Sequence, residues 1–381
     1  MRIIIGSQTY PLPNGVTNSI NTSVDGFVAA GHEVMLIAPE YDIKPVRPEH
    51  RVVPGSSFSR NAIKLAGVMG KKELIFSLSA GSEIRQLAED FKPDAYWLHQ
   101  VTYASNVFER HVVKSGLPSV LTYHTLLDYY GKTYFGRIGE QAMIFRSAKV
   151  ANNVDKVIAP SQYVKNRLIK WGVKKPIEVI ATGIEPIEKS LTPGQLHQKF
   201  NIPAEHQVLL FVGRVVKEKN IDSLLNMLKQ LVKTDPKVTL LLIGPGDLEE
   251  TATQAEEMGI GRNIVLSGQV PQDETRQCYG AADVFVFASQ SETQGLVIGE
   301  AMLAELPVAA LVSPIQPEVY PEEVAVVVRN ERDFATAVSR LLRDPIRSQS
   351  LKTKAKKFVE ENFSKRKMIE KQIALFTGLL S

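Results

Sequence analysis

The chain has 381 residues, 44% hydrophobic and 23% charged, which is typical of a folded protein with more than one core. Its formal net charge of +4 is too small to indicate nucleic-acid binding, and a single cysteine, Cys278, excludes a disulfide within the chain. No apolar run approaches the roughly 18 residues of a membrane-spanning helix, and residues 1–10 lack the pattern of a signal peptide. We therefore expect a cytoplasmic protein of two or three domains.

The first half of the chain alternates strand and helix patterns. A buried strand is predicted over residues 2–5, a helix over 16–30 and a second strand over 34–38, which together make a βαβ unit. Further strands are predicted at 95–98, 119–123, 156–159 and 177–180. A helix is predicted at 162–171, with Ser161 as its cap.

The same alternation restarts near residue 205, after a stretch rich in glycine and proline over 181–203 that has the composition of a linker. The predicted strands and helices of the second half lie at 207–212, 221–233, 237–243, 247–259, 263–266, 272–281 and 283–288. We therefore predict an α/β protein with two Rossmann-like domains facing a cleft, residues 1–185 and 186–363. A last helix over 364–381 is expected to cross back and pack on the first domain.

The stretch Ala288–Ala309 is the most informative, because a strand there runs into a small polar loop and a helix begins near Gly295. The free N–H groups and positive dipole end at a helix start suit an anion such as a diphosphate. Glu292 lies before this helix and Glu300 within it, a helical span of at most about 12 Å. Because carboxylates accept hydrogen bonds from hydroxyls, we expect them to hold the two ends of a nucleotide-sugar.

A second stretch ends a strand at Gly213 and then presents Arg214 and Lys219. Glycine lets a ligand approach the backbone closely. The two cations are suited to neutralise two phosphates, which is work that a metal ion often does. No Asp-x-Asp cluster is present in the sequence.

Together, Gly-Arg-x4-Lys followed by Glu-x7-Glu closely resembles the retaining glycosyltransferases of family 4, which have the GT-B fold. The resemblance spans nearly the whole chain and is stronger in the second half. Besides the residues above, the matching positions are Gly15, Val16, Gly31, His32, Pro93, Asp94, His99, His124, Ser161, Thr182, Gly183, Ile184, Gly244, Gly246, Gly268, Val270, Ala282, Asp283, Ser289, Leu296, Ala301 and Pro307.

This resemblance implies transfer from a nucleotide-sugar, with a UDP-sugar expected, and it implies that neither a cofactor nor a metal ion is needed. Arg214 and Lys219 would bind the diphosphate, Glu300 the ribose and Glu292 the sugar hydroxyls, with base contacts from the backbone near Val270. The implied donor-binding residues are Gly15, Val16, Gly213, Arg214, Lys219, Val270, Glu292, Thr293, Gln294, Gly295, Leu296 and Glu300. The implied catalytic residues are His124, Glu292, Arg214 and Lys219.

Two candidate residues of the first half, His99 and His124, lie at predicted strand ends, which line the ligand site in such sheets, and Asp128 is the acid close behind His124. The resemblance implies that His124 contacts the donor sugar near the reacting carbon. For His99, acceptor binding and a structural role both stay open. Asp128 would serve a double displacement as nucleophile or would orient the acceptor; we favour front-face attack, in which the leaving phosphate takes the acceptor proton.

The chain departs from the family pattern at three places. Glu305 stands where relatives usually have glycine, residues 313–318 replace a Gly-Gly loop, and Asn14-Gly15 replaces two glycines. These departures leave the predicted fold intact and bear on how the donor is held.

Acceptor identity rests on the resemblance to a bacterial branch that glucosylates diacylglycerol. Residues 60–76 and 132–150 mix basic with apolar side chains, which favours an anionic membrane surface on the inner face of the membrane, although solvated helix faces have the same pattern. Alternatives are a soluble or surface-polysaccharide acceptor with UDP-N-acetylglucosamine or GDP-mannose as donor. Two alternatives of lower rank are a nucleotide-sugar epimerase and a non-catalytic protein that binds a nucleotide-sugar. The sequence does not indicate an oligomeric state.

Overall fold

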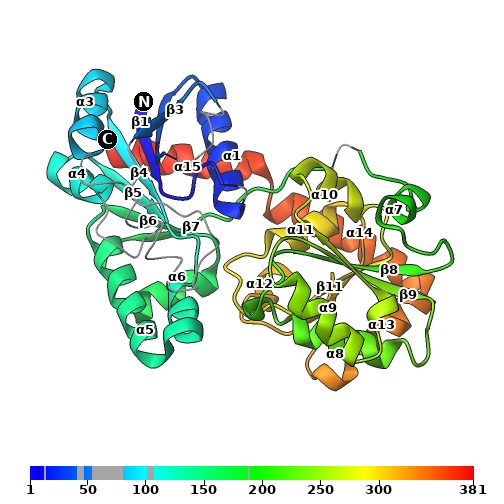
Figure 1. The fold of residues 1–381 in the computed structure, drawn as a ribbon. Helices are drawn as coiled ribbons and strands as arrows, with labels where there is room; N and C mark the ends of the chain where they lie inside the picture. The colour runs from blue at the N-terminus through cyan, green and yellow to red at the C-terminus, as the bar shows by residue number, and fades with distance from the viewer. Residues whose placement is uncertain (13, 41–46, 54–79, 101–106, 188) are drawn as a thin grey trace. The chain divides into compact units, whose positions relative to one another are not determined.

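The computed structural model describes residues 1–12, 14–40, 47–53, 80–100, 107–187 and 189–381. These residues divide into two compact units, Met1–Gly183 with Lys365–Ser381, and Ile184–Ser364. Each unit is a parallel sheet flanked by helices (Figure 1). The predicted class of two Rossmann-like domains is therefore confirmed, whereas the expected cleft stays a prediction.

In the first unit, the described residues form seven parallel strands in the order β3-β2-β1-β4-β5-β6-β7. This order reverses between β1 and β4, as in the Rossmann fold. The strands are β1 (Arg2–Ser7), β2 (Glu33–Pro39), β3 (His50–Val53), β4 (Ala95–His99), β5 (Ser119–Thr122), β6 (Lys156–Ala159) and β7 (Ile177–Val179).

Helices cover both faces of this sheet because successive strand residues point to opposite sides. Ile4 packs on one side with the buried residues of α3, α4 and α6, and Ile3 packs on the other with those of α1 and α15. Phe376 of α15 contacts Phe27 and Trp97, so the last helix does pack on the first unit, as predicted. The helices are α1 (Gly15–Ala29), α3 (Ala80–Phe91), α4 (Val107–Ser115), α5 (Leu127–Asn152), α6 (Gln162–Lys170) and α15 (Lys365–Leu380).

Helix α5 is sharply bent at Gly136, whose φ of 62° and ψ of −156° are not helical. The bend brings Gly131 and Gly139 so close that a methyl group on either would overlap the other's carbonyl oxygen. Residues 134–138 therefore form the apex between two helical arms, within the segment 132–150 that the sequence marks as basic and apolar. The other such segment, 60–76, lies outside the described residues.

In the second unit, the described residues form six parallel strands in the order β10-β9-β8-β11-β12-β13, which reverses between β8 and β11. The strands are β8 (Gln207–Val212), β9 (Val238–Ile243), β10 (Ile264–Gly268), β11 (Val284–Phe287), β12 (Val308–Leu311) and β13 (Val326–Val328). The helices are α7 (Pro193–Phe200), α8 (Ile221–Leu231), α9 (Leu248–Glu257), α10 (Gln272–Tyr279), α11 (Leu296–Leu303), α12 (Gln316–Val319), α13 (Phe334–Arg343) and α14 (Pro345–Asn362), with 3₁₀ turns η1 (Lys217–Lys219), η2 (Gly261–Asn263) and η3 (Glu331–Asp333).

The interpretation of residues 181–203 as a linker is wrong in part, because α7 lies within them. Thr192 and Gln195 form a reciprocal capping box at its start, and Pro193 occupies the first turn. Proline is favoured there because its missing N–H would have no partner in the helix anyway. Glycine and proline content alone therefore concealed a capped helix.

Glu305, where relatives usually have glycine, has a left-handed backbone with a φ of 56° just after α11. Such a conformation costs an L-residue about 1–2 kcal/mol. Its side chain pairs with Lys356 of α14, with Oε1 and Nζ 2.8 Å apart, but both side chains are largely exposed. Pairs of this kind contribute only about 0–1 kcal/mol.

We predict that the Glu305→Gly variant is more stable than Glu305→Ala by about 1 kcal/mol. Both changes remove the ion pair with Lys356, but only glycine relieves the backbone conformation. The free energy of unfolding from urea titrations followed by circular dichroism measures the difference. Identical values for the two variants would show that this backbone position is not strained.

Candidate active site

The two stretches singled out in the second half of the sequence meet at one edge of the second sheet. Gly213 and Arg214 directly follow β8, and the loop 288–295 follows β11. These strands are neighbours, and the strand order reverses between them because β8 pairs with β9 on its other side. Parallel sheets bind ligands beyond the carboxyl ends of their strands at such a switch point.

Glycines hold the loop after β8 against the loop after β9. Gly244 and Gly246 have φ values of 147° and 151°, a region that favours glycine. A methyl group on Gly244 would overlap the carbonyl of Gly213, and one on Gly246 would overlap that of Val215. These two glycines therefore fix the path by which the backbone carries Arg214 away from the sheet.

Two ion pairs connect the predicted phosphate-binding cations to acids. The Arg214 guanidinium lies 2.7 Å from Oε1 of Glu218, whose side chain is fully buried. Lys219 Nζ lies 2.6 Å from Oε1 of Glu292, with both side chains mostly buried. The Ser291 hydroxyl donates to the Glu218 carbonyl at 3.2 Å. The turn η1 and the loop after β11 are thus joined directly.

This pairing keeps the Glu292 carboxylate ionised. Burial alone would raise its pKa, but the Lys219 charge, hydrogen bonds from Lys219 and Ser289, and the Arg214 charge together lower the pKa below its usual value. Glu292 is therefore a charged acceptor at neutral pH, as hydroxyl binding requires.

Helix α11 begins where the sequence predicts a helix start. Gly295 precedes the helix with a φ of 69°, and Leu296 is its first residue. Thr293 is half-buried and Gln294 is buried in the preceding loop. The helix N–H groups at this end carry a partial positive charge.

Glu300 is held apart from the ion pairs. The buried Tyr279 hydroxyl of α10 donates to its Oε2 at 2.9 Å. Burial raises the pKa of Glu300, against the opposing effects of the Tyr279 hydrogen bond and the Arg276 charge. Among the ion pairs of the described residues, none joins Glu300 to Arg214 or Lys219.

Val270 lies in the loop between β10 and α10, where its carbonyl accepts a hydrogen bond from the Thr275 hydroxyl at 3.4 Å. β10 is two strands away from β8 in the sheet. The base contacts expected near Val270 stay a prediction.

In the first unit, Gly15 and Val16 open helix α1, and Asn14 caps it. The Asn14 side chain accepts hydrogen bonds from the amides of Val16 and Thr17 at 2.9 and 3.0 Å. A donor phosphate would therefore compete with Asn14 for the Val16 amide. Gly15 is exposed.

His99 and His124 come together at the carboxyl ends of β4 and β5, which are neighbours in the first sheet. His99 ends β4 and His124 follows β5, and His99 Nδ1 lies 2.9 Å from His124 Nε2. The two rings are stacked with centroids 5.1 Å apart. Burial lowers the pKa of His124 to about 4, so the ring is neutral at physiological pH.

Asp128 lies in the first turn of α5 and is paired with Arg167 of α6. The Arg167 guanidinium also lies over the rings of Tyr163 and Trp171, at 5.6 and 5.3 Å from their centroids. This packing gives the buried Asp128 a structural partner. Its role toward an acceptor stays a prediction.

Glu218 and Tyr279 were missed by sequence reasoning. Glu218 stands four residues after Arg214, a spacing at which opposite charges meet on a helical turn, so the signal was present. Tyr279 gave no such signal, because its contact with Glu300 depends on how α10 packs beside α11.

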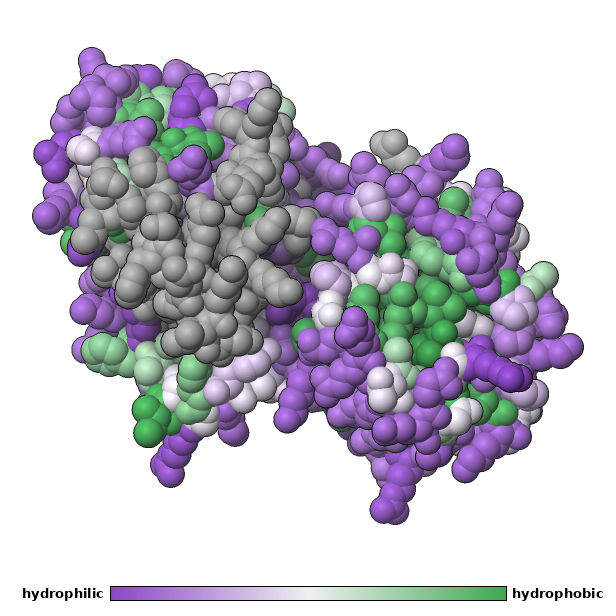
Figure 2. All heavy atoms as spheres, in the orientation of Figure 1, coloured by the Kyte–Doolittle hydropathy of each residue, from purple (hydrophilic) through white to green (hydrophobic). Residues whose placement is uncertain are grey.

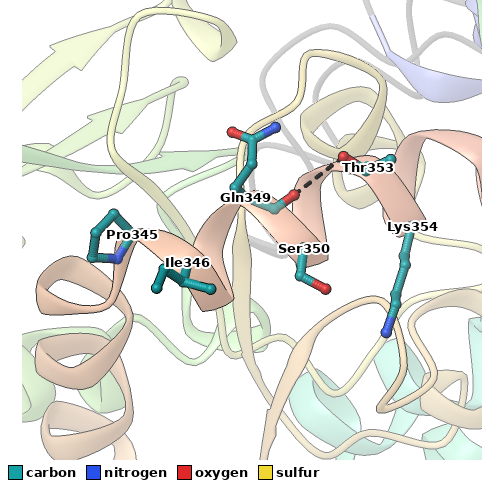
Figure 3. A pocket seen from close by; sticks show the side chains of 6 residues that line it. All are labelled: Pro345, Ile346, Gln349, Ser350, Thr353 and Lys354. Carbon is teal, nitrogen blue, oxygen red and sulfur yellow. Dashed lines mark hydrogen bonds between the residues drawn. The ribbon is translucent and has the colours of Figure 1, made fainter.

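A shallow hollow of about 630 Å³ lies elsewhere, along α14 (Figure 3). It is lined by Pro345, Ile346, Gln349, Ser350, Thr353 and Lys354, and it contains no residue of the predicted site. Within the described part of the chain, no three His, Cys, Asp or Glu side chains cluster as metal ligands would. None of the described helices combines the length and the hydropathy of a membrane-spanning segment.

Two family descriptions match the chain, one on each half. They are "Glycosyltransferase Family 4" over residues 13–187 and "Glycosyl transferases group 1" over residues 194–358. Among curated proteins, alpha-monoglucosyldiacylglycerol synthase of Streptococcus pneumoniae is 28% identical over 383 residues, covering 96% of this chain and 84% of that protein. The enzyme of the same name from Acholeplasma laidlawii is 29% identical over 330 residues, covering 81% and 79%.

Solved structures show the same fold. Sucrose-phosphate synthase from Thermosynechococcus elongatus superposes with a TM-score of 0.80 at 19% identity, over 100% of this chain and 99% of that one. HepE from Anabaena, in complex with UDP and glucose, gives 0.79 at 17% identity, over 99% and 100%.

The fold and the matched families define a glycosyltransferase that uses a nucleotide-sugar. The chain belongs to the group 1 glycosyltransferases of family 4, with the GT-B fold, and is a retaining enzyme. The predicted family and enzyme class are therefore confirmed, whereas the individual site residues stay predictions.

We predict that Lys219→Gln weakens UDP binding by about 10–100-fold, the range expected for one charge-assisted contact to a phosphate. Lys217→Gln, which removes an equal charge from an exposed residue in the same turn, should change the affinity little. Isothermal titration calorimetry with UDP measures both. Equal weakening in the two variants would mean that only the net charge of the turn matters.

Proposed function

We propose that this enzyme transfers a hexose, with UDP-glucose as the expected donor, to a hydroxyl of a membrane lipid such as diacylglycerol. The observation that carries the proposal is the match, over 96% of this chain, to an alpha-monoglucosyldiacylglycerol synthase. A second enzyme of that name matches over 81%. The site geometry and one exposed surface support it.

The ion pairs of the second unit suit a departing nucleotide diphosphate. Arg214 and Lys219 follow the strand that borders the switch point, and each already faces an acid. Fixed cations of this kind stabilise the negative charge that develops on the leaving phosphate and need no reorganisation during the reaction. Glu292 would hold the sugar hydroxyls, and Glu300 the ribose.

In the proposed reaction, the bond between the anomeric carbon and the leaving phosphate breaks while the acceptor oxygen attacks from the same face. The leaving phosphate takes the proton of the acceptor hydroxyl. His124 would hold a sugar hydroxyl near this carbon. The pairing of Asp128 with Arg167 favours this route over a covalent intermediate on Asp128, because an acid paired with a cation is a weaker nucleophile.

The bent apex of α5 is suited to a membrane surface. Its apolar side chains are exposed, with Ile138 86% and Phe135 51% accessible, and Lys132 and Arg137 beside them are exposed too. Figure 2 shows hydrophobic atoms at the end of α5, among hydrophilic ones. Apolar side chains that enter the lipid interface next to basic ones that meet anionic headgroups are typical of peripheral binding.

One basic residue of this segment does not belong to the surface. Arg146 turns inward and pairs with the buried Glu109 of α4. This ion pair connects the part of α5 that follows the bend to α4 of the same unit. The apex is therefore held in place relative to α4. The membrane contribution of 132–150 is therefore confined to its apex and to exposed residues such as Phe145 and Lys149.

A second candidate is mannosyl transfer from GDP-mannose. It is favoured by one relative, the GDP-mannose-dependent alpha-mannosyltransferase of Mycolicibacterium smegmatis, which is 24% identical over 81% of this chain and 79% of that protein. The identity is lower than for the glucosyltransferases, so we rank it second.

The proposal is tested by incubating the purified full chain with UDP-glucose, UDP-galactose, UDP-N-acetylglucosamine or GDP-mannose. Thermal shifts rank the donors, because a ligand that binds the folded state raises the melting temperature. Vesicles that contain diacylglycerol are then added. We expect UDP-glucose to give an α-glucosyl lipid, identified by mass spectrometry and by NMR of the anomeric proton. Transfer from another donor to a water-soluble acceptor alone would overturn the proposal.

We predict that Ile138→Asp weakens binding to anionic vesicles by about 10–100-fold, because an apolar side chain that leaves water contributes about 1.5–3 kcal/mol. Ile346→Asp is the matched control, since Ile346 is also an isoleucine, is 84% accessible and lies on α14 of the other unit. Vesicle flotation measures both. Binding that Ile138→Asp leaves unchanged would exclude the apex as a membrane contact.

A further inference from the structure

The Glu300 carboxylate receives one side-chain hydrogen bond among the described residues, and Tyr279 supplies it. The Tyr279 hydroxyl donates to Oε2 at 2.9 Å. Glu300 is half-buried, and its other oxygen, Oε1, is not one of the buried polar atoms without a partner. One oxygen is therefore occupied, while the other reaches the surface and is able to accept a further hydrogen bond.

The Tyr279 ring is held firmly, so its hydroxyl has a fixed place. The ring is fully buried at the end of α10 and lies 5.8 Å from that of Phe285 on β11, centroid to centroid. Glutamate is one of the side chains that lose most rotamer freedom when they are ordered. The hydroxyl therefore orders Glu300 before a nucleotide binds.

Helix α10 is anchored within the same unit. Arg276 donates to the carbonyls of Glu185 and Pro186 at 2.7 and 3.1 Å. The Leu191 amide donates to the Gln277 carbonyl at 2.9 Å. These contacts, made by residues that precede α7 in the chain, fix the end of α10 that carries the tyrosine.

The hydrogen bond from Tyr279 also favours the charged form of the carboxylate. Burial raises the pKa of Glu300, and the Tyr279 hydrogen bond and the Arg276 charge oppose that rise. Hydrogen bonds to an ionised acceptor are stronger than those to a neutral one. Tyr279 therefore supports both the orientation and the charge of the carboxylate.

We propose that Tyr279 is a positioning residue, which holds one oxygen of the Glu300 carboxylate so that the other accepts a hydrogen bond from a ribose hydroxyl of the bound nucleotide. The inference rests on the proposed role of Glu300 at the ribose end of the donor. Tyr279 then acts through Glu300 and does not itself contact the nucleotide. Its loss should lower the preference for ribose over deoxyribose, and not merely the overall affinity or the stability.

The test compares the wild-type chain with the Tyr279→Phe variant by isothermal titration calorimetry with UDP, 2′-deoxy-UDP and 3′-deoxy-UDP. We expect the wild-type chain to bind UDP about 10–100-fold more tightly than the analogue that lacks the hydroxyl held by Glu300, the effect of one hydrogen bond to a charged group. In Tyr279→Phe this preference should fall by about 3–10-fold, the effect of one neutral hydrogen bond. An unchanged preference, or equal weakening of all three ligands, would refute the positioning role.

A double variant tests whether Tyr279 acts through Glu300. In Glu300→Ala the preference for ribose should be lost, and the addition of Tyr279→Phe should change it no further. Independent effects of the two changes on the preference would contradict the proposal.

Tyr320→Phe is the matched control. It removes the hydroxyl of another fully buried tyrosine of the same unit, which donates to the Leu311 carbonyl at 2.9 Å. It should leave the preference for ribose unchanged. A fall like that in Tyr279→Phe would show that the effect is structural, and the proposal would fail.

The wild-type chain provides a second test, should Tyr279→Phe fail to fold. In a crystal structure with UDP, we expect the ribose hydroxyl to bind the Glu300 oxygen that Tyr279 leaves open, with the tyrosine contact kept. A ribose that displaces the Tyr279 hydroxyl would overturn the proposal. If GDP binds and UDP does not, the proposed donor is wrong, and the same series with GDP and its deoxy analogues still tests Tyr279. Binding of neither nucleotide would overturn both.

Discussion

The Lys219–Glu292 ion pair is the interaction around which the second unit's site is organised. It joins the turn after β8 to the loop after β11, which are close only because those two strands are neighbours where the order of the sheet reverses. Two largely buried charges are stable only as a pair, since either alone would keep the penalty of lost hydration. The pair therefore fixes both loops and keeps a carboxylate ionised beside a cation before any ligand arrives.

The first unit has the same kind of strand order, but side chains of a different chemical type lie at the carboxyl edge of its sheet. The carboxyl ends of its neighbouring strands β4 and β5 bring together two neutral rings, His99 and His124, in place of charged groups. Charges suit the diphosphate end of a nucleotide-sugar, and neutral donors suit hydroxyls. The division of labour proposed for the two units follows from which side chains each sheet places at its carboxyl edge.

Apolar patterns in the sequence placed β1, β2 and the strands from β4 to β11 to within a few residues, because such patterns are local. They placed only half of the α-helices of the described residues, namely α1, α6, α8, α9, α10, α11 and α15, and they gave no prediction for β3, β12 and β13. Motif spacing also singled out Arg214, Lys219, Glu292 and Glu300 as candidate site residues, and the structure places Lys219 beside Glu292. Sequence reasoning did not find the Tyr279–Glu300 hydrogen bond, and it described residues 132–150 only as basic and apolar. The bend at Gly136 and the inward pairing of Arg146 with Glu109 depend on contacts between segments far apart in the chain.

The amino-acid sequence by itself determined the class of fold, the two-part organisation and the family, since hydrophobic periodicity and short motifs encode them residue by residue. Only the tertiary structure decided which acid neutralises which cation, which hydroxyl holds Glu300 and how the two histidines meet. The physical reason is that these side chains are brought within hydrogen-bonding distance by strand order and helix packing. Neither the strand order nor the helix packing can be read from the spacing of residues along the chain.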